Sequence, residues 1–369
     1  MEDEVINSII IDNGTSYIKA GLGCEETPKV VFKNFVGYPK YSSPFNEKVY
    51  FVGEEAEKKK TITKLKYPME HGVVFDWDNM EKIWRYTFND ELKVEADEYN
   101  IMLTEAPNNP KRNKEKIGEI MFETFNACGL YIEKPGVLSL YAAGKFNGIA
   151  VDLGGAVSQF IPIYDGYAIS EGVIRLDFGG KDLTEYMVEL LNESEERFYK
   201  KAEKILVEEI KKKACYVASY FDDEIKNVEN FDYELPDGTH IIVKDQRIKV
   251  PEALFNPWLV KQYAFEGIAK TCYNSIHKCE IDTRKDIYRA IILSGGNSMF
   301  EGLPERFRKE IIYLAPESLK EEVNVISSPE RKFNAWIGGQ ILSSLSTLKW
   351  VTKSEYEESG SAILHERFK

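Results

Sequence analysis

The sequence predicts an α/β protein of two related domains, and three observations support this prediction. Short β-branched runs alternate with longer segments whose apolar residues recur at helical spacing. An apolar strand that runs into aspartate and a glycine turn occurs at Asp12 and again at Asp152. No Gly-, Ser- or Pro-rich linker divides the 369 residues. We therefore expect two domains that share a rigid core and a cleft.

Composition excludes several classes of function. The 61 acidic and 48 basic residues give a net charge of −13, which argues against a nucleic-acid partner. No apolar run approaches the roughly 20 residues of a membrane span, and the acidic start MEDEVINS lacks the features of a signal peptide. The five cysteines are scattered without a C-x-x-C, and the four histidines stand apart. The composition predicts an intracellular protein with reduced thiols and without a transition-metal site.

The first half of the chain alternates strands and helices. Ile9–Asp12 and Lys29–Phe35 are predicted strands, and Asn79–Asn89 is a predicted helix. Asn100–Leu103 is a short buried strand before the sequence TEAP. A second helix is expected over Lys114–Phe125, where apolar residues repeat on one face.

The second half repeats the pattern. Ile149–Gly155 (IAVDLGG) resembles the first strand and turn, and FIPIYDG follows it as another strand. A helix begins at Leu183, and Lys200–Tyr216 is a helix whose many charges we interpret as a solvated face. A third variant, Ala290–Gly296 (AIILSGG), carries serine in place of the acid.

The glycine turns admit two interpretations. Asn13-Gly14 is a common hairpin turn, so two unrelated hairpins would explain the pattern. Alternatively, Gly14, Gly154 and Gly155 let backbone N–H groups approach phosphate oxygens, because no Cβ stands in the way. Lys19 would add a positive charge. On this second interpretation Asp12 and Asp152 would hold a hydrated Mg²⁺, which usually uses one or two carboxylates, and SGGNSMF would cover the base or ribose.

Long stretches along almost the whole chain resemble the actin and actin-related protein family. They are IDNGTSYIKAG, LKYPMEHGVVFDWDNMEKIW, MLTEAPNNP, IMFETFN, VLSLYAAG, YELPDG, PEALF, IILSGG, PERKF, WIGGQILSSLST and EYEESG. The resemblance implies the actin-type two-domain ATPase fold, with duplicated ribonuclease-H-like domains and a central nucleotide cleft for ATP or ADP with Mg²⁺ (Ca²⁺ in vitro). It implies four subdomains, at residues 1–33 with 69–142 and 332–369, at 34–68, at 143–179 with 268–331, and at 180–267.

The resemblance also assigns site residues. It places the metal at Asp12 and Asp152. The residues implied near the phosphates are Asn13, Gly14, Thr15, Lys19, Gly154, Gly155, Ala156 and Val157. Those implied around the nucleoside are Gly180, Lys211, Gly295, Gly296, Met299, Phe300 and Lys332. A groove that receives amphipathic helices of partners is implied at Tyr141, Ile341, Leu342, Leu345 and Thr347, with the last four on one helix.

Departures from the family concern hydrolysis. Pro135 stands where the family has a glutamine that orients the attacking water, and proline has no side-chain group for this task. Leu153, Gly155 and Gln159 replace the usual serine, aspartate and histidine. Losing a water-orienting or proton-transfer group typically costs 10²–10⁴-fold in rate, so we expect retained binding with slow or absent hydrolysis. The alternative is that a neighbouring residue takes over the water.

Further departures concern the nucleoside and the polymer contacts. Glu208 and Lys212 stand where the family tends to have an arginine and a glutamate, which affects ribose binding. The loop Lys40–Tyr50 is shorter than in actin and more charged, which predicts a weaker longitudinal contact. Trp258 lies in a second altered segment, which includes the loop that forms cross-strand contacts in the family. A position in the core is the simpler interpretation of this tryptophan.

Three functions remain at this stage. The first is an ATP-binding subunit of an actin-related assembly that caps, templates or forms short filaments. Its partners would be other actin-family subunits and actin-binding proteins, without nucleic acid or membrane insertion. The second is a conventional filament-forming actin with a working ATPase. The third is a sugar kinase or Hsp70-like chaperone of the same fold, for which neither a base motif nor a peptide-binding domain is evident. We expect the cytoplasm (cytoskeleton), with the nucleus as the other compartment.

Overall fold

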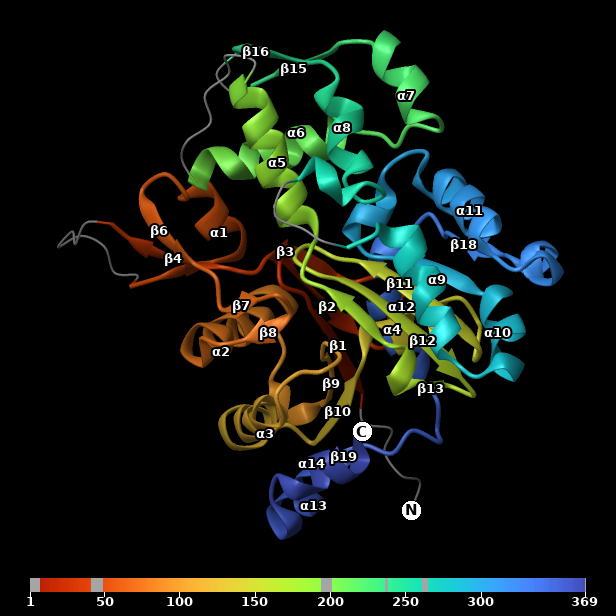
Figure 1. Ribbon diagram of the computed structural model, residues 1–369. Coiled ribbons are helices and arrows are strands. Elements are labelled where there is room, and N and C mark those ends of the chain that lie inside the picture. Colours follow the sequence, from red (N-terminus) through yellow and green to blue (C-terminus); the bar gives the residue numbers. More distant parts are fainter. Residues whose placement is uncertain (1–6, 41–48, 194–200, 236–237, 261–264, 369) are drawn as a thin grey trace. The chain divides into compact units, whose positions relative to one another are not determined.

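The computed structural model describes residues 7–40, 49–193, 201–235, 238–260 and 265–368, with side chains in the third range from residue 204 (Figure 1). It divides into two compact units. Unit 1 is Met1–Lys145 with Phe333–Lys369, and unit 2 is Phe146–Lys332. The division of the chain into four subdomains stays a prediction.

Unit 1 is built on a six-stranded mixed sheet. Its order is β19 (Val351–Thr352), β10 (Gly129–Glu133), β9 (Asn100–Thr104), β1 (Ser8–Asn13), β2 (Tyr17–Leu22) and β3 (Val30–Lys33). β1, β9 and β10 run parallel, whereas β2 returns antiparallel to β1. The carboxyl ends of the three parallel strands therefore meet at one edge of the sheet, where β1 delivers Asp12 and Asn13.

Both faces of β1 are buried, which explains its uninterrupted apolar run. Ile9 and Ile11 face a core that contains Trp84 of helix α2 (Trp77–Tyr86). On the other face, Ile10 packs with Leu138 and Trp336 from α4 (Pro135–Ala142) and α12 (Asn334–Ser343). The indole of Trp336 donates a hydrogen bond to the carbonyl of Ile10, at 3.0 Å. The strand that carries Asp12 is thus fixed from both sides.

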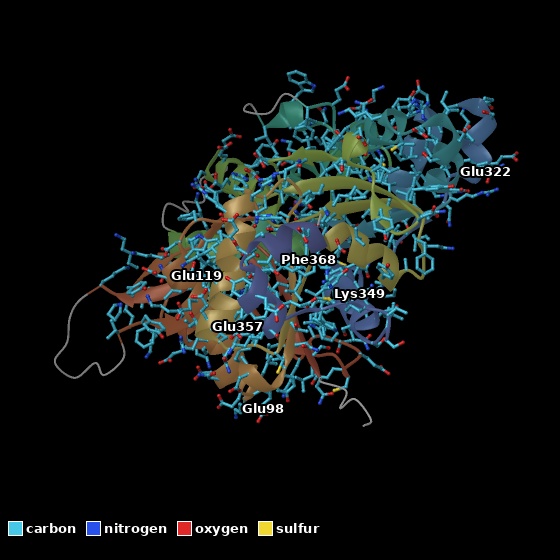
Figure 2. All side chains as sticks on the ribbon, turned by 90° about the horizontal axis from the view of Figure 1, so that it is seen from below. Glu98, Glu119, Glu322, Lys349, Glu357 and Phe368 are labelled. Carbon is cyan, nitrogen blue, oxygen red and sulfur yellow. The ribbon has the colours of Figure 1, made fainter. Side chains whose placement is uncertain are left out.

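Smaller elements complete unit 1. A three-stranded sheet contains β5 (Phe51–Val52), β4 (Val36–Pro39) and β6 (Thr63–Lys66), with helix α1 (Gly53–Lys58) beside it, and β7 (Met69–Glu70) pairs with β8 (Val73–Val74). α13 (Lys353–Ser359) and α14 (Ala362–Arg367) end the unit, and Figure 2 labels Phe368 just beyond α14. α14 packs on α3 (Lys111–Glu119), because Lys114 donates to the carbonyl of Phe368 and His365 pairs with Glu115.

Unit 2 repeats the strand pattern of unit 1. β11 (Gly148–Leu153), β17 (Ile291–Ser294) and β18 (Val325–Ile326) run parallel, and β12 (Ser158–Tyr164) returns antiparallel to β11. β13 (Tyr167–Ala168) and β14 (Ile174–Leu176) both pair with β12. The neighbour relations of β11, β12 and β17 therefore match those of β1, β2 and β9. This repeat agrees with the predicted duplication.

Helices of unit 2 surround an apolar core that includes Phe160, Phe178 and Phe307. They are α5 (Gly180–Glu193), α6 (Lys201–Ala214), α7 (Phe221–Glu224), α8 (Gln246–Glu252), α9 (Ile268–Lys278), α10 (Ile281–Tyr288) and α11 (Leu303–Leu314). A two-stranded ribbon is formed by β15 (Phe231–Glu234) and β16 (His240–Val243). Short helical turns connect these elements, among them η7 (Gly296–Met299) after β17.

Several predicted bounds need correction. The two helices expected in unit 1 are not regular to their ends: α2 continues as the π-helical turn η1 (Thr87–Leu92), and α3 as η3 (Ile120–Thr124). The rings of Phe88 and Phe125 meet there with centroids 5.0 Å apart. α5 begins three residues before the predicted Leu183, because its first N–H groups bond to a distant turn described below.

Other corrections concern surface residues. The core interpretation of Trp258 is wrong, because its side chain is 71% exposed. α12 ends at Ser343, so Leu345 and Thr347 follow the helix rather than belonging to it. Residues 41–48 of the predicted contact loop and residues 261–264 beyond Trp258 lie outside the described residues.

The close approach of α12 to α4 requires glycine at position 338. A Cβ at Gly338 would lie 1.7 Å from the carbonyl oxygen of Leu138, which is backbone and cannot move aside. We expect Gly338→Ala to lower the free energy of unfolding by at least about 2 kcal/mol in urea titrations followed by circular dichroism. Gly296→Ala is the control, since a Cβ there meets no atom within 4 Å. Equal stability of the two variants would contradict this account of the packing.

Candidate functional site

The first strand-end aspartate is held by two partners. Asp12 lies opposite Lys19 in the β1–β2 register, and Lys19 Nζ lies 2.6 Å from Asp12 Oδ2. The hydroxyl of Thr104, at the end of β9, donates to Asp12 Oδ1 at 3.0 Å and accepts from the N–H of Asn13 at 2.8 Å. The carboxylate is therefore fixed by a salt bridge on one side and by a hydroxyl on the other.

The turn after Asp12 is tight and requires glycine. The N–H of Gly14 donates to the carbonyl of Asp12 at 3.1 Å, and a Cβ at Gly14 would lie 2.7 Å from the carbonyl oxygen of Tyr17. The hydroxyl of Thr15 accepts from the N–H of Gly72 at 2.8 Å. Within the described ranges of the chain, the N–H of Thr15 donates to no acceptor, so this turn presents a donor to its surroundings.

The second turn repeats this arrangement in unit 2. Asp152 accepts a hydrogen bond from the hydroxyl of Ser294, at the end of β17, over 3.2 Å. The N–H of Gly154 donates to the carbonyl of Val157 at 2.9 Å, and a Cβ at Gly154 would stand 2.9 Å from that same oxygen. The N–H of Gly155 has no acceptor among the residues that the structure describes. Gly14 and Gly154 thus occupy equivalent turns.

The first residues of α5 form hydrogen bonds with the second turn. The N–H groups of Gly180 and Lys181 donate to the carbonyls of Gly154 and Gly155, at 3.1 and 2.7 Å. These bonds satisfy the first donors of the helix, which have no partner inside it. They also explain why the helix starts before its apolar periodicity does.

Three of the residues predicted to surround the nucleoside lie beside the second turn. Lys211 donates from Nζ to the carbonyl of Gly180 at 2.5 Å and to the hydroxyl of Thr184 at 2.9 Å. The Lys211 side chain is only 3% exposed, and burial lowers its pKa to about 8. Gly295 has φ +84°, and a Cβ there would lie 2.5 Å from Asp152 Oδ1. Lys211, Gly180 and Gly295 therefore surround the second turn.

The remaining predicted residues are distributed differently. Ala156 and Val157 are buried in the second turn, Gly296 is exposed, and Met299 is half-buried. Phe300 packs into the core of unit 2. Lys332 is the exposed last residue of unit 2.

Positions that depart from the family have clear local environments. Pro135 is the first residue of α4, where its fixed φ and missing N–H suit a helix start. Before it, Glu133 accepts the N–H of Lys134 at 2.9 Å, and burial raises the pKa of its carboxyl. Leu153 is a core residue. Lys212 pairs with Glu208 at 2.8 Å, so the acid and base noted in the sequence neutralise each other.

Gln159 stands opposite Asp152 in the β11–β12 register, at the position that Lys19 has in unit 1. Its side chain is 2% exposed, and its Oε1 accepts no hydrogen bond within the described part of the chain. A buried acceptor without a donor is costly, by about 1–3 kcal/mol. Water or a bound group is the natural source of the missing donor.

The two hydroxyl residues were not predicted as site residues. Thr104 and Ser294 each end the parallel strand beside an aspartate-bearing strand. The sequence contained a partial signal, because AIILSGG places a serine where the other two strands place an acid. The strand pairing that brings each hydroxyl to a carboxylate depends on tertiary structure.

The predicted partner groove is only partly exposed. Leu342 is buried with Ile10 and Trp336, and Tyr141 and Ile341 are half-buried. Leu345 and Thr347 are exposed. Leu342 therefore supports the fold of unit 1 rather than lining an open surface.

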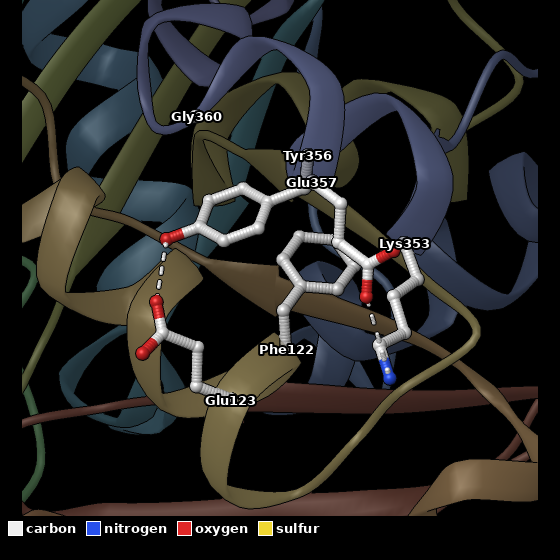
Figure 3. A pocket seen from close by; sticks show the side chains of 6 residues that line it. All are labelled: Phe122, Glu123, Lys353, Tyr356, Glu357 and Gly360. Atoms are coloured by element: carbon white, nitrogen blue, oxygen red, sulfur yellow. Dashed lines mark hydrogen bonds and ion pairs between the residues drawn. The ribbon is translucent and has the colours of Figure 1, made fainter.

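A separate pocket of about 390 Å³ lies on unit 1, where the rings of Phe122 and Tyr356 stack with centroids 4.6 Å apart (Figure 3). Tyr356 donates to Glu123 at 3.4 Å, and Lys353 pairs with Glu357 at 3.7 Å. Its lining residues are Phe122, Glu123, Lys353, Tyr356, Glu357 and Gly360. None of the predicted nucleotide or metal residues belongs to it.

The residues of each turn fit phosphate oxygens of a nucleotide and supply one carboxylate suited to magnesium. Each turn leaves no room for a Cβ at its glycine and presents an N–H donor, which suits phosphate oxygens. No group of three or more His, Cys, Asp or Glu side chains gathers among the described residues. Asp12 and Asp152 are each the kind of ligand that Mg²⁺ uses, since this ion usually relies on one or two carboxylates together with phosphates and water. Among the described helices, none has the length and apolarity to cross a membrane.

A family model described as Actin matches residues 3–369, which is nearly the whole chain.

The environment of Lys211 predicts a dependence of stability on pH. Between pH 8 and 10.5 the unfolded chain retains the Lys211 proton that the folded chain has lost, so the contribution of Lys211 to the free energy of unfolding rises with pH, by about 3 kcal/mol across this range. We expect Lys211→Met to lack this rise in urea titrations across that range. The exposed Lys64→Met is the control and should follow the wild type. Parallel curves for wild type and Lys211→Met would contradict the assignment.

Proposed function

The chain belongs to the actin family, and from this premise we propose that it is an ATP-binding subunit of an actin-related assembly. It acts as a cap, a template or a short filament, and it hydrolyses ATP slowly or not at all. The family binds ATP or ADP with a divalent cation, and the chain is an actin-like, nucleotide-binding protein. The paired Asp-x-Gly turns are the observation that supports retained binding.

Phosphate binding is assigned to the two turns. Asn13, Gly14, Thr15 and Lys19 would act from unit 1, and Gly154, Gly155, Ala156 and Val157 from unit 2. The backbone N–H groups of Thr15 and Gly155, which have no acceptor in the described structure, would donate to phosphate oxygens, and Lys19 would offset charge while remaining hydrogen-bonded to Asp12. Asp12 and Asp152 would hold Mg²⁺, which neutralises phosphate charge when it is bound. Gly180, Lys211, Gly295, Gly296, Met299, Phe300 and Lys332 are assigned to the nucleoside.

Slow hydrolysis is inferred from Pro135. Its side chain can neither accept nor donate a hydrogen bond, so it cannot orient an attacking water. Leu153 and Gly155 likewise supply no polar side-chain group at the second turn. Without such a group the expected loss is about 10²–10⁴-fold in rate. Nucleotide then serves mainly as a structural ligand, which stabilises the form that binds it.

Gln159 favours a second candidate, the filament-forming actin with a working ATPase. Its buried Oε1 lacks a donor in the described structure, and a water molecule could supply one. A glutamine carbonyl beside a phosphate turn is a known way to orient water, as in small GTPases. If Gln159 does so here, it compensates in part for Pro135.

Assembly partners are assigned by family membership. We assign other actin-family subunits and actin-binding proteins with amphipathic helices, docking near Tyr141, Ile341 and Leu345. Cytoskeletal association follows from the family, and the cytoplasm is the proposed compartment.

A single-turnover assay with Mg-ATP separates the two candidates. We expect bound ATP to persist for hours in the wild type, with bound nucleotide and released phosphate followed together. Pro135→Gln should accelerate cleavage at least tenfold, since it restores a polar side chain at the start of α4.

Pro304→Gln is the matched control, because Pro304 occupies the first turn of α11 and lies at none of the assigned positions. It should leave cleavage unchanged. Prompt cleavage by the wild type, accelerating with protein concentration, would instead establish the filament-forming candidate.

A further inference from the structure

In each of the two turns, at Gly14 and at Gly154, the glycine carbonyl accepts a hydrogen bond from a buried asparagine side chain. In unit 1, Asn34 Nδ2 donates to the carbonyl of Gly14 at 2.8 Å. In unit 2, Asn297 Nδ2 donates to the carbonyl of Gly154 at 2.6 Å. Asn34 follows β3 and Asn297 lies in η7, so the two asparagines come from unrelated elements. The same contact has thus been built twice, on the equivalent glycine.

This contact determines where the next backbone donor points. In a trans peptide the C=O and the following N–H point in opposite directions. Fixing the carbonyl of Gly14 toward Asn34 therefore directs the N–H of Thr15 away from Asn34. Asn297 orients the N–H of Gly155 in the same way. Neither of these two N–H groups has an acceptor within the described residues.

Asn34 makes a second contact with the first turn. Its own N–H donates to the carbonyl of Ser16 at 3.0 Å, so one residue holds the carbonyls on both sides of Thr15. Its side chain is 1% exposed, yet its Oδ1 accepts no hydrogen bond in the described structure. An orphaned buried acceptor costs stability, so the contribution of Asn34 to the turn comes from its Nδ2 and backbone N–H donors.

Asn297 is similarly integrated into the second turn. It is 6% exposed, and a Cβ on Gly180 would lie 3.0 Å from its Oδ1. The carbonyl of Gly154 accepts from both Asn297 and the N–H of Gly180. Two donors on one carbonyl leave its peptide plane little freedom to rotate.

We propose that Asn34 and Asn297 are positioning residues that preorganise the two turns for the phosphate chain of a nucleotide. The proposal rests on the proposed nucleotide-binding function and adds the residues that set its phosphate affinity. Neither asparagine needs to touch the ligand. Each acts by fixing one peptide plane of its turn. The turn is then already ordered before the ligand binds, so binding costs less conformational entropy.

The test compares a phosphate ligand with a ligand that lacks phosphate. Calorimetric titrations would use Mg-ATP, magnesium with inorganic tripolyphosphate, and adenosine on the full chain. We expect Asn34→Leu and Asn297→Leu each to weaken binding of ATP and tripolyphosphate about tenfold, the equivalent of one hydrogen bond. Adenosine binding by Asn34→Leu should stay unchanged, because the hydrogen bonds of Asn34 in the described structure go to residues of unit 1, whereas the residues assigned to the nucleoside belong to unit 2.

Asn113→Leu is the matched control. Asn113 is 4% exposed and donates to the carbonyl of Val74 at 3.1 Å, and in the described structure it forms no hydrogen bond with Gly14 or Gly154. It should lose stability in urea titrations while keeping the wild-type ratio of ATP to adenosine affinity. Should the leucine variants fail to fold, Asn34→Ser and Asn297→Ser replace them, with side chains too short to reach the glycine carbonyls.

The outcomes distinguish the two proposals. A wild type that binds ATP, with asparagine variants that keep its affinity ratio, overturns the positioning role alone. A wild type that binds neither ATP nor tripolyphosphate overturns the proposed function, and the positioning role with it. Loss of affinity for all three ligands by Asn34→Leu would indicate a general structural defect and also contradict the proposal.

Discussion

A hydroxyl on the neighbouring parallel strand fixes each of the two strand-end aspartates, and the candidate site depends on this contact. Thr104 holds Asp12 and Ser294 holds Asp152, at 3.0 and 3.2 Å. Parallel pairing places both hydroxyls at the carboxyl edge of their sheets, where the chain turns sharply at Gly14 and Gly154. The strand pairing at that edge therefore determines where the carboxylate lies. It also determines where the turn begins and which way its N–H groups point.

The two units differ in the residue across the strand pair. Lys19 forms a salt bridge with Asp12, whereas the equivalent position opposite Asp152 holds the neutral Gln159. A partly buried pair such as Lys19 and Asp12 gains little net stability from its charges, because desolvation offsets their attraction, so the pair acts mainly by fixing the first turn. The duplicated architecture therefore carries two chemically different turns, one with a lysine and one with an unsatisfied amide oxygen.

Sequence patterns predicted the strands best, because runs such as IIIDNGT and IAVDLGG are buried on both faces and closed by glycine. The fold class and family followed from long matching stretches. What the patterns missed depends on contacts between distant residues. The start of α5 is set by carbonyls of the second turn, Asn34 and Asn297 act across 20 and 143 positions, and nothing local distinguishes the exposed Trp258 from a core tryptophan.

The most direct measurement is the amide resonance of Thr15 and of Gly155 during titration with Mg-ATP. Selective ¹⁵N labelling, with assignment by substitution, would follow one donor in each unit. The account predicts that both resonances shift together and saturate at one nucleotide per chain, while adenosine leaves them in place. Resonances that do not move, or that saturate at different ATP concentrations, would show that the two turns do not bind one phosphate chain.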